Sequence, residues 1–460
     1  MAVRLIRSDI WCICLCGMIC GETGRGEILL GNTGMNQCTP SGAIYNPANA
    51  PHVRGRFEAE LPLMIKKSEF SAKYPQSDKY TKKTSGFSGE SFKGLIMGDG
   101  GGPGYVYKLN DRYAFSFIGM KIPGPVSIEN NDIPIFMLGQ MNMADIAIEV
   151  SDASFFQFIQ GYKLNRNFSL GTIFTKENAT VSGKISSSGQ GTELASFDGN
   201  MDFSSVWGGL RISVLPDVFT LSGAALLYSS TRINLNPYLA MSSESSETTR
   251  QALNPVKIDQ NGSFRQFRAG WAFKRRILTL FQDFNIDLKP EEKKTFSVSK
   301  LKMAEKEYNH RIAVGMGLDG RLSQSRSVLL GWRYVPARIG AGSGNPDGSS
   351  GFGSLDQGMI MLGLGDLEPY YQGSIGIEFR FLKAGENENR SQGSAHSDAY
   401  SKSAGDQNRF VSDGSSYHKL LVRTGTVYRK GMLEIDKNGE QPGTYQQSTW
   451  LFPVNLIMRF

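Results

Sequence analysis

Apolar and polar residues alternate along many stretches of this chain. Successive side chains of a β-strand point to opposite faces, so a period of two predicts strands with one apolar and one mixed face. Residues 375–381 place four apolar residues on one face and both Glu378 and Arg380 on the other. The same period recurs in residues 57–65 and 312–318. The pattern predicts an all-β protein built from half-apolar strands.

The alternation is most regular at the end of the chain, from Trp450 to Phe460. Every second residue there is apolar, and aromatic residues include Trp450, Phe452 and Phe460. Such a final strand is typical of outer-membrane β-barrels, in which the last strand closes the ring against the first. The last strand of a soluble sandwich is the alternative. We interpret these three aromatic residues as part of a barrel closure.

Short turns and long polar stretches alternate between the predicted strands. The sequence Tyr-Lys-Leu-Asn occurs at 107–110 and again at 162–165, and a third turn lies at 215–217. Short turns at one end and long loops at the other indicate a transmembrane antiparallel β-barrel, here of about 14 strands. The predicted long loops are residues 71–102, 187–200, 289–307, 341–353 and 383–449. Within the last of these, residues 420–428 also alternate, and they either extend the final hairpin or raise the count to 16.

The amino-acid composition argues against a helical membrane protein and against a nucleic-acid-binding protein. Only 40% of the 460 residues are hydrophobic, the mean hydropathy is -0.27, and no stretch approaches the roughly 20 apolar residues of a spanning helix. Fifty-three glycines and 11% aromatic residues suit tight turns and aromatic girdles. The net charge is +7, but basic residues sit singly or in short groups at turns, as in residues 273–276, so nucleic-acid binding is not predicted.

The first residues have the pattern of a secretory signal. Arg4 and Arg7 precede a short apolar run at 10–19, which is too short to span a bilayer. We predict a signal peptide over residues 1–24. Its removal leaves Cys38 as the one cysteine, so no intramolecular disulfide is expected.

No pattern in the sequence indicates catalysis or a cofactor. The glycine-rich residues 98–104 lack the Lys-Ser/Thr end of a phosphate-binding loop, and the four histidines have no metal-like spacing. A lipase embedded in a barrel is the enzyme alternative, but no nucleophile-elbow motif supports it. We therefore expect neither an enzyme nor a cofactor nor a metal.

One strand ends unusually, in Pro123-Gly124-Pro125. Two prolines remove two donors from the hydrogen-bond ladder, and the glycine frees the backbone. Either the strand stops there and a loop begins, or the barrel wall can open sideways at this point.

Several motifs, in order along the chain, resemble the FadL family of outer-membrane transporters for long-chain fatty acids and other hydrophobic compounds. They are Asn46-Pro47-Ala48, residues 103–107 with 110–111, residues 310–315, and Trp450-Leu451-Phe452 with Phe460. The resemblance implies a monomeric 14-stranded barrel over residues 54–460 with long extracellular loops, and an N-terminal hatch over residues 25–53. Asn46, Pro47 and Ala48 would belong to the hatch, and Pro123, Gly124 and Pro125 would form the kink that opens a lateral gate in the third strand.

The implied function is passive uptake through the Gram-negative outer membrane. A hydrophobic ligand would bind from outside and leave through the wall into the membrane. The expected partners are this ligand, outer-membrane lipid with lipopolysaccharide, and the barrel-assembly machinery, which would read the closing strand. No residue matches the family's basic ligand-binding groups, so ligand-binding residues remain unassigned. Two alternatives are a polar-solute porin lined by residues such as Glu378 and Arg380, and a surface adhesin or receptor that acts through the loop after Lys383.

Overall fold

The structure is a computed structural model of the whole chain. It describes residues 26–31, 33–74, 79–87, 104–121, 125–137, 140–242, 248–252, 255–262, 265–288, 297–298, 301–302, 310–337, 366–383, 418–435 and 443–460. The predicted signal over residues 1–24 therefore lies outside the described residues.

Strands make up most of the described chain. They are β1 Phe57–Lys73, β2 Tyr80–Phe87, β3 Gly104–Lys108, β4 Tyr113–Lys121, β5 Val126–Met137, β6 Gln140–Lys163, β7 Phe168–Ser187, β8 Glu193–Leu215, β9 Phe219–Ser242, β10 Thr248–Ala252, β11 Val256–Gly262, β12 Gln266–Arg275, β13 Leu278–Asp287, β14 Ser297–Val298, β15 Leu301–Lys302, β16 Arg311–Arg321, β17 Arg326–Val335, β18 Tyr370–Lys383, β19 His418–Ile435 and β20 Gly443–Arg459. Three short helices precede them, η2 Gly26–Leu30, α2 Pro40–Tyr45 and η3 Pro47–His52. None of the described helices is long and apolar enough to cross a membrane.

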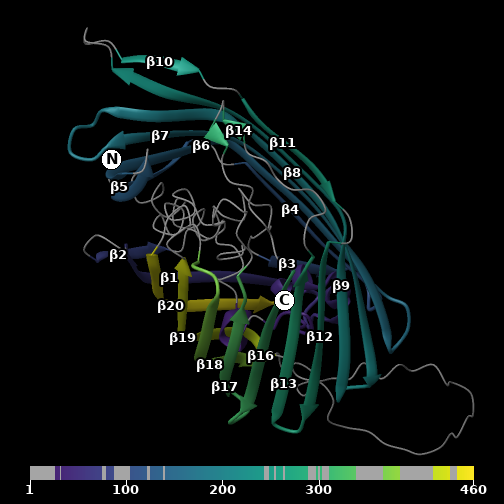
Figure 1. The fold of residues 1–460 in the computed structure, drawn as a ribbon. Helices are drawn as coiled ribbons and strands as arrows, with labels where there is room; N and C mark the ends of the chain where they lie inside the picture. The colour runs from purple at the N-terminus through teal and green to yellow at the C-terminus, as the bar shows by residue number, and fades with distance from the viewer. Residues whose placement is uncertain are drawn as a thin grey trace, which may run out of the picture.

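The strands form a closed antiparallel barrel of 14 positions, arranged in sequence order around the ring (Figure 1). Three positions are made of pieces: β2 with β3, β4 with β5, and β12 with β10 and β11, which pair along the far end of β9. The ring closes where β20 pairs with β1, from Glu58 opposite Arg459 to Lys73 opposite Thr444. The predicted fold class and strand number are confirmed. The short β14 and β15 pair only with each other among the described residues.

The repeated Tyr-Lys-Leu-Asn sequences form matching hairpin turns. The Asn110 side-chain oxygen accepts from the backbone N–H groups of Arg112 and Tyr113, at 2.9 and 2.8 Å. Asn165 accepts in the same way from Asn167 and Phe168, at 2.8 and 2.9 Å. Asparagine favours such turns because its side chain satisfies backbone donors two and three residues on. We call the end of the barrel that carries these turns the short-turn end.

The closing strand has the predicted faces. Trp450, Phe452 and Phe460 lie exposed on the outer face, whereas Leu451 and Asn455 are fully buried on the inner face. Across from them, β1 buries Glu58 and Glu60 inside the ring.

Parts of two predicted loops are strands instead. Within residues 71–102, β1 ends at Lys73 and β2 spans Tyr80–Phe87, and β8 begins within 187–200. The outer face of β2 is polar, as in Thr81 and Lys83, so alternation of apolar residues did not reveal it. Residues 341–353 lie outside the described residues, as do most of 289–307.

The stretch 383–449 is not one loop: the strand that the alternation of residues 420–428 suggested is present, and it is one of the 14, so the count is not raised to 16. The stretch contains β19, the thirteenth position of the ring, and the start of β20. Lys383 pairs with His418, and Arg380 donates to the carbonyl of Ser325 in a short turn. The connection after Lys383 therefore begins and returns at the short-turn end, which removes the structural basis for an adhesin that acts through it on the long-loop side.

We predict that Asn110→Ala lowers the free energy of unfolding by about 1 kcal/mol, because two backbone donors lose their acceptor. Urea unfolding of the barrel in lipid vesicles measures this. Asp111→Ala, in the same exposed turn, is the matched control, and equal effects of the two substitutions would contradict the prediction.

Candidate functional site: an inner segment, a lateral seam and an apolar lining

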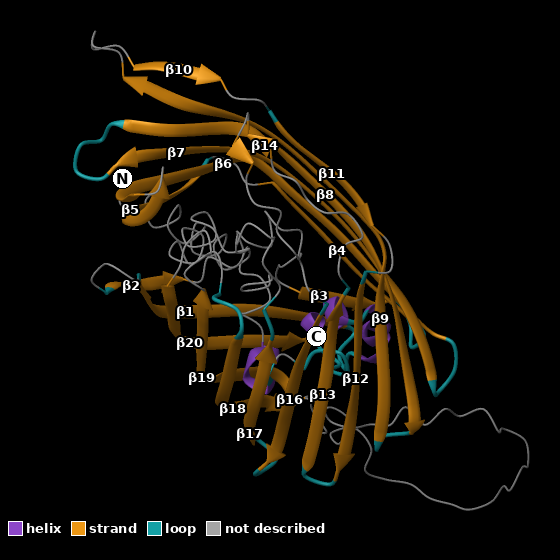
Figure 2. Ribbon diagram, in the orientation of Figure 1, coloured by secondary structure: helices purple, strands orange, loops and turns teal. Residues whose placement is uncertain are grey.

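Residues 26–53, here called the inner segment, lie inside the ring (Figure 2). The helix η2 contacts β16 to β20, α2 contacts β1 and β3, and η3 contacts β4, β6, β7 and β8. Because these strands come from all round the barrel, the inner segment reaches across the lumen. It corresponds to residues 25–53, for which the resemblance implied a hatch.

Asn46 and the two prolines around it set the local backbone. Pro40 and Pro47 occupy first-turn positions of α2 and η3, where the missing N–H costs nothing. Asn46 ends α2 and caps η3, since its Oδ1 accepts from the N–H of Ala48 at 3.1 Å. Its Nδ2 also donates to the carbonyl of Leu210 in β8 at 3.0 Å. One residue thus joins the two helices and ties them to the wall.

A row of small residues on the wall receives this turn. Ala114, Gly161, Gly171, Gly209 and Ala224 are consecutive cross-strand partners from β4 to β9. A Cβ atom on any of the three glycines would come within 3.0 Å of the turn that contains Asn46 and Pro47, closer than real Cβ contacts. The missing side chains therefore allow Asn46, Pro47 and Ala48, all buried, to lie directly on the wall.

Charged wall residues bind polar atoms of the nearly uncharged inner segment. Glu60 accepts from the N–H and hydroxyl of Ser41, at 2.8 and 2.6 Å. Asp283, on the other side of the ring, accepts from the N–H of Met35 at 2.8 Å. Arg211 donates to the Asn36 carbonyl and the Asn49 side chain, at 3.2 and 2.9 Å. These bonds are charge-assisted and come from several directions, so they hold the segment as a unit.

Glu378 and Arg380 do lie on the inner face, but they are paired. Glu378 is 2% exposed and binds Arg380 and Arg423, each at 2.7 Å. Arg423 also donates to Gln37 of the inner segment at 3.2 Å. A buried ion-pair network that touches the inner segment differs from the water-lined wall expected of an open polar porin.

His52 is the ionisable group that the inner segment buries against the wall. Its Nε2 lies 2.7 Å from the hydroxyl of Ser169 on β7. Burial, and then the nearby cations Arg211, Lys163 and Lys108, lower the pKa of His52 to about 3. The seated segment therefore contains a neutral imidazole.

The wall has an unpaired stretch between its second and third positions, which we call the lateral seam. Within the described chain, β2 pairs only with β1 and β5 pairs only with β6, and Figure 1 shows β2 and β5 well apart. Below them, β3 and β4 share two residue pairs, Tyr107 with Phe115 and Lys108 with Ala114. Among the residues that the structure describes, the barrel is thus joined here only at the short-turn end.

Tyr105 marks the level at which the ladder stops. Its hydroxyl accepts from the N–H of Phe117 at 3.0 Å and donates to the Phe117 carbonyl. These are the two backbone groups that a continued β3–β4 ladder would have used. At Phe117 a side chain thus takes the place of the neighbouring strand, so this residue's backbone groups are satisfied without closing the wall.

Most of the predicted kink lies outside the described residues. Pro125 is described and exposed, just before β5, whereas Pro123 and Gly124 lie outside the described residues. Both β4 and β5 pair with the same strand, β6, so the third position is interrupted between them rather than ended. Sequence reasoning missed Tyr105, although an aromatic residue facing the broken strand is the kind of signal that could have pointed to it.

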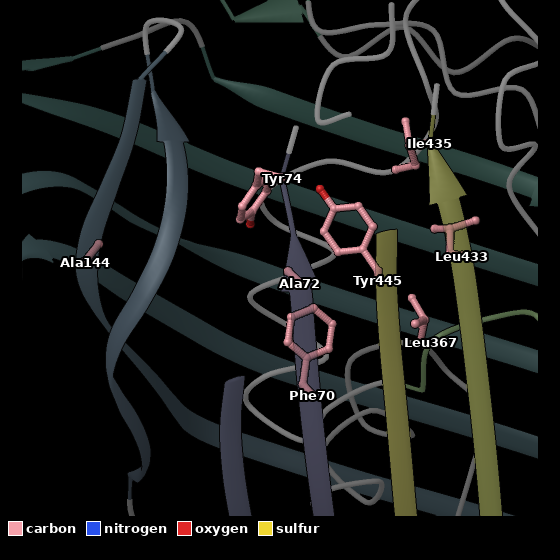
Figure 3. Close-up of a cluster of buried hydrophobic side chains, with 8 residues drawn as sticks. All are labelled: Phe70, Ala72, Tyr74, Ala144, Leu367, Leu433, Ile435 and Tyr445. Atoms are coloured by element: carbon pink, nitrogen blue, oxygen red, sulfur yellow. The ribbon is translucent and has the colours of Figure 1, made fainter. Parts of the chain in front are cut away.

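An apolar lining covers the inner face at the long-loop end (Figure 3). It comprises Phe70, Ala72, Tyr74, Ala144, Leu367, Leu433, Ile435 and Tyr445, all buried. The ring centroids of Phe70 and Tyr74 lie 6.4 and 6.0 Å from that of Tyr445. On β1 the outer face is apolar from Phe57 to Ile65 and then carries Lys67 and Glu69, whereas the inner face becomes apolar from Phe70 onward.

Two kinds of reactive group, cysteine and metal-binding side chains, were also considered. Cys38 is a free, half-buried cysteine. No group of three or more metal-binding side chains occurs among the residues that the structure describes.

These features define the class as an antiparallel 14-stranded barrel whose lumen holds an N-terminal segment. Among solved structures, a Pseudomonas aeruginosa FadL homologue is similar, with 14% identity, a TM-score of 0.54, and coverage of 96% of this chain and 100% of that one. The Pseudomonas putida toluene transporter TodX matches with 11% identity and a TM-score of 0.54 over 94% of this chain and 97% of its own. CymD, described as a monoaromatic hydrocarbon channel, matches with 10% identity and a TM-score of 0.51 over 96% and 98%.

The chain therefore has the FadL/TodX type of barrel fold, as the sequence resemblance implied. No protein-family model and no curated sequence matches it.

We predict that Gly171→Leu displaces the inner segment, because its side chain would occupy the place of Pro47. Single-channel conductance in planar bilayers should rise, while the barrel stays folded. Gly373→Leu is the control, since a Cβ at Gly373 meets nothing within 4 Å. Unchanged conductance in a folded Gly171→Leu protein would contradict the prediction.

We also predict that acid loosens the inner segment. The pKa of His52 is about 3 when seated and near the ordinary 6.5 when released, so the released state binds more protons between these values. The inner segment is therefore bound most strongly to the wall above pH 6.5, and its binding weakens as the pH falls towards about 3. Conductance at about pH 5 should exceed that at neutral pH, and His52→Gln should remove most of this difference. A variant with the full pH dependence would show that another group is responsible.

Proposed function

We propose that this protein takes up hydrophobic compounds passively across the Gram-negative outer membrane, and that they leave the barrel sideways. The exposed apolar side chains on the outer face of the barrel, here called the apolar outer belt, such as Phe117, Phe174 and Phe452, support insertion into a membrane. The observation that carries the lateral route is the seam, where β2 and β5 lack a ladder to one another among the described residues.

The location of the seam supports the proposal physically. Its lower limit is Phe117, an exposed residue of the outer apolar face. Phe156 on β6 and Phe174 on β7 continue this face at the same height, in edge contacts with centroid separations of 5.1 and 5.8 Å. An opening at this height faces lipid, so an apolar molecule could pass from the lumen to the bilayer without crossing water.

The lining and the inner segment supply the other two steps of the proposal. Aromatic and aliphatic side chains such as Phe70 and Tyr445 would bind the compound at the long-loop end, where the outer surface is polar. The inner segment, as the hatch, would block straight passage to the short-turn end. Its motif Asn46-Pro47-Ala48 would fix it on the glycine row.

The ligand class that we propose spans monoaromatic hydrocarbons and long-chain fatty acids. TodX is described as a toluene transporter, and CymD as a hydrocarbon channel, and both have this fold. The lining offers mostly apolar contact, which favours apolar bodies over polar solutes.

The test of the lateral route is to replace Pro123-Gly124-Pro125 by alternating Thr and Val, which restores ladder donors. Uptake of a labelled hydrophobic compound by cells should fall about tenfold or more, because the wall is then completed by a continuous strand. Pro453→Val, in the closing strand far from the seam, is the matched control. Normal uptake by a folded, correctly inserted seam variant would overturn the lateral exit.

A further inference from the structure

The outer surface of the barrel carries a groove that the transport proposal does not use. It lies across β6, β7, β8, β9 and β12, on the membrane-facing side of the glycine row, and encloses about 850 Å³. Its rim is formed by outward side chains including Tyr162, Leu170 and Leu227, which are 43%, 45% and 36% exposed. Its floor is low because Gly208, Gly223 and Ala225 project little or nothing outward.

A second hollow of about 340 Å³ continues the groove towards β13. The two share Leu210, Gly223 and Ala269, and Trp271 and Phe284 line the second. A connected depression of this size is comparable to ligand pockets of soluble proteins, yet its walls are almost wholly apolar. An occupant must therefore offer a long apolar body.

Polar groups cross the groove at one level. The Tyr113 hydroxyl donates to Gln160 at 3.2 Å, and Gln160 donates to Thr172 at 3.0 Å. Exposed polar groups on a lipid-facing surface are unfavourable unless they are bonded, and this row bonds to itself. Its hydroxyl groups also keep further hydrogen-bonding capacity, which an ester or glycerol oxygen can use.

Two cations lie at the short-turn edge of the groove. Arg112 immediately precedes Tyr113, and Arg166 lies in the next turn, below Leu170; both are exposed. The N–H of Lys163 donates to the carbonyl of Arg112 at 2.7 Å, which holds the two turns side by side. Asp111 is the one carboxylate on these tips, so a positive charge remains where the apolar belt ends.

From this arrangement we infer a binding site for one phospholipid of the leaflet at the short-turn end. One acyl chain fills the groove over Gly223, the glycerol ester region meets Gln160 and Thr172, and the phosphate binds Arg112 and Arg166. Arginine at the headgroup level, directly beyond an apolar surface, is the charge arrangement that a phospholipid complements. The inference requires the outer belt to lie in a bilayer, but it does not require transport.

Groove-filling substitutions test the acyl-chain part. A Cβ at Gly223 would meet no atom closer than 3.8 Å, so Gly223→Leu fits the backbone and fills the groove. Gly320→Leu is the control, because Gly320 is an equally open outward position on β16, away from the groove. If Gly223→Leu does not fold, Ala269→Leu fills the same space from the neighbouring strand.

The measurement is native mass spectrometry of the delipidated full chain in detergent, titrated with dioleoylphosphatidylglycerol. The unchanged protein should retain one lipid, Gly223→Leu should bind it about tenfold more weakly, and Gly320→Leu should behave like the unchanged protein. Equal retention by the two leucine variants would overturn the site.

Two further arms test the headgroup. Arg112→Gln with Arg166→Gln should weaken phosphatidylglycerol binding about tenfold, whereas Arg275→Gln, at the exposed end of β12, should not. Oleate should be retained less well than the phospholipid, since it lacks the glycerol and the second chain. If oleate binds as tightly and competes for the groove, the occupant is a free fatty acid and the inference is wrong. Uptake is measured separately, so failure of this site and failure of the transport proposal are distinguishable.

Discussion

Backbone hydrogen bonding is the constraint on which this structure depends. In a bilayer no water can satisfy an exposed N–H or C=O group, so a barrel must close its ladder all round. Here the ladder closes over the full length of β1 and β20, and ladders join the later positions, although β10 and β11 pair only with β9 among the described residues. The lateral seam departs from this rule. It is tolerable at its lower limit because the Tyr105 hydroxyl satisfies both backbone groups of Phe117. Because the Tyr105 side chain replaces the missing strand partner of Phe117, we interpret the break in the ladder as a specific feature of the fold rather than a disordered strand edge.

The two faces of the wall follow from the same requirement. Near the short-turn end, apolar side chains face outward, and charged groups such as Glu58 and Glu378 are buried inside with arginine partners. Beyond Ile65 the outer face of β1 is polar, as expected of a strand that extends past the bilayer into water, and from Phe70 the inner face is apolar. The apolar side chains then gather inside, around Tyr445. The change from apolar to polar side chains on the outer face of a long strand such as β1 thus indicates where the strand leaves the membrane.

Features of the fold that depend on residues close in sequence could be predicted, whereas features that depend on residues brought together by strand register could not. The closing strand and the Asn110 and Asn165 turns were predicted correctly because alternation and turn chemistry are local. The alternation of residues 420–428 indicated part of β19, but its bounds were missed, and the start of β8 was read as loop, because a strand segment with a polar outer face has little local signal. The glycine row was not predictable in the same way. Gly171 and Gly209 are partners only through strand register, and nothing near either residue shows that both contact the Pro47 turn. The role of Tyr105 likewise depends on which residue lies opposite.

The barrel wall is thinnest beside the Pro47 turn, where the inner segment contacts it. Gly171 and Gly209 remove side chains from the inner face, and Gly208 and Gly223 remove them from the outer face one position away. Between the turn at Pro47 and the outer groove there is then little more than one layer of backbone. A sheet without side chains loses the packing that normally holds it flat. Here the inner segment supplies that packing from one side through Pro47 and the capped Asn46, and a lipid chain in the groove would supply it from the other. The two contacts support the same few residues of β7 and β8, which is why small side chains are needed on both faces of so short a stretch.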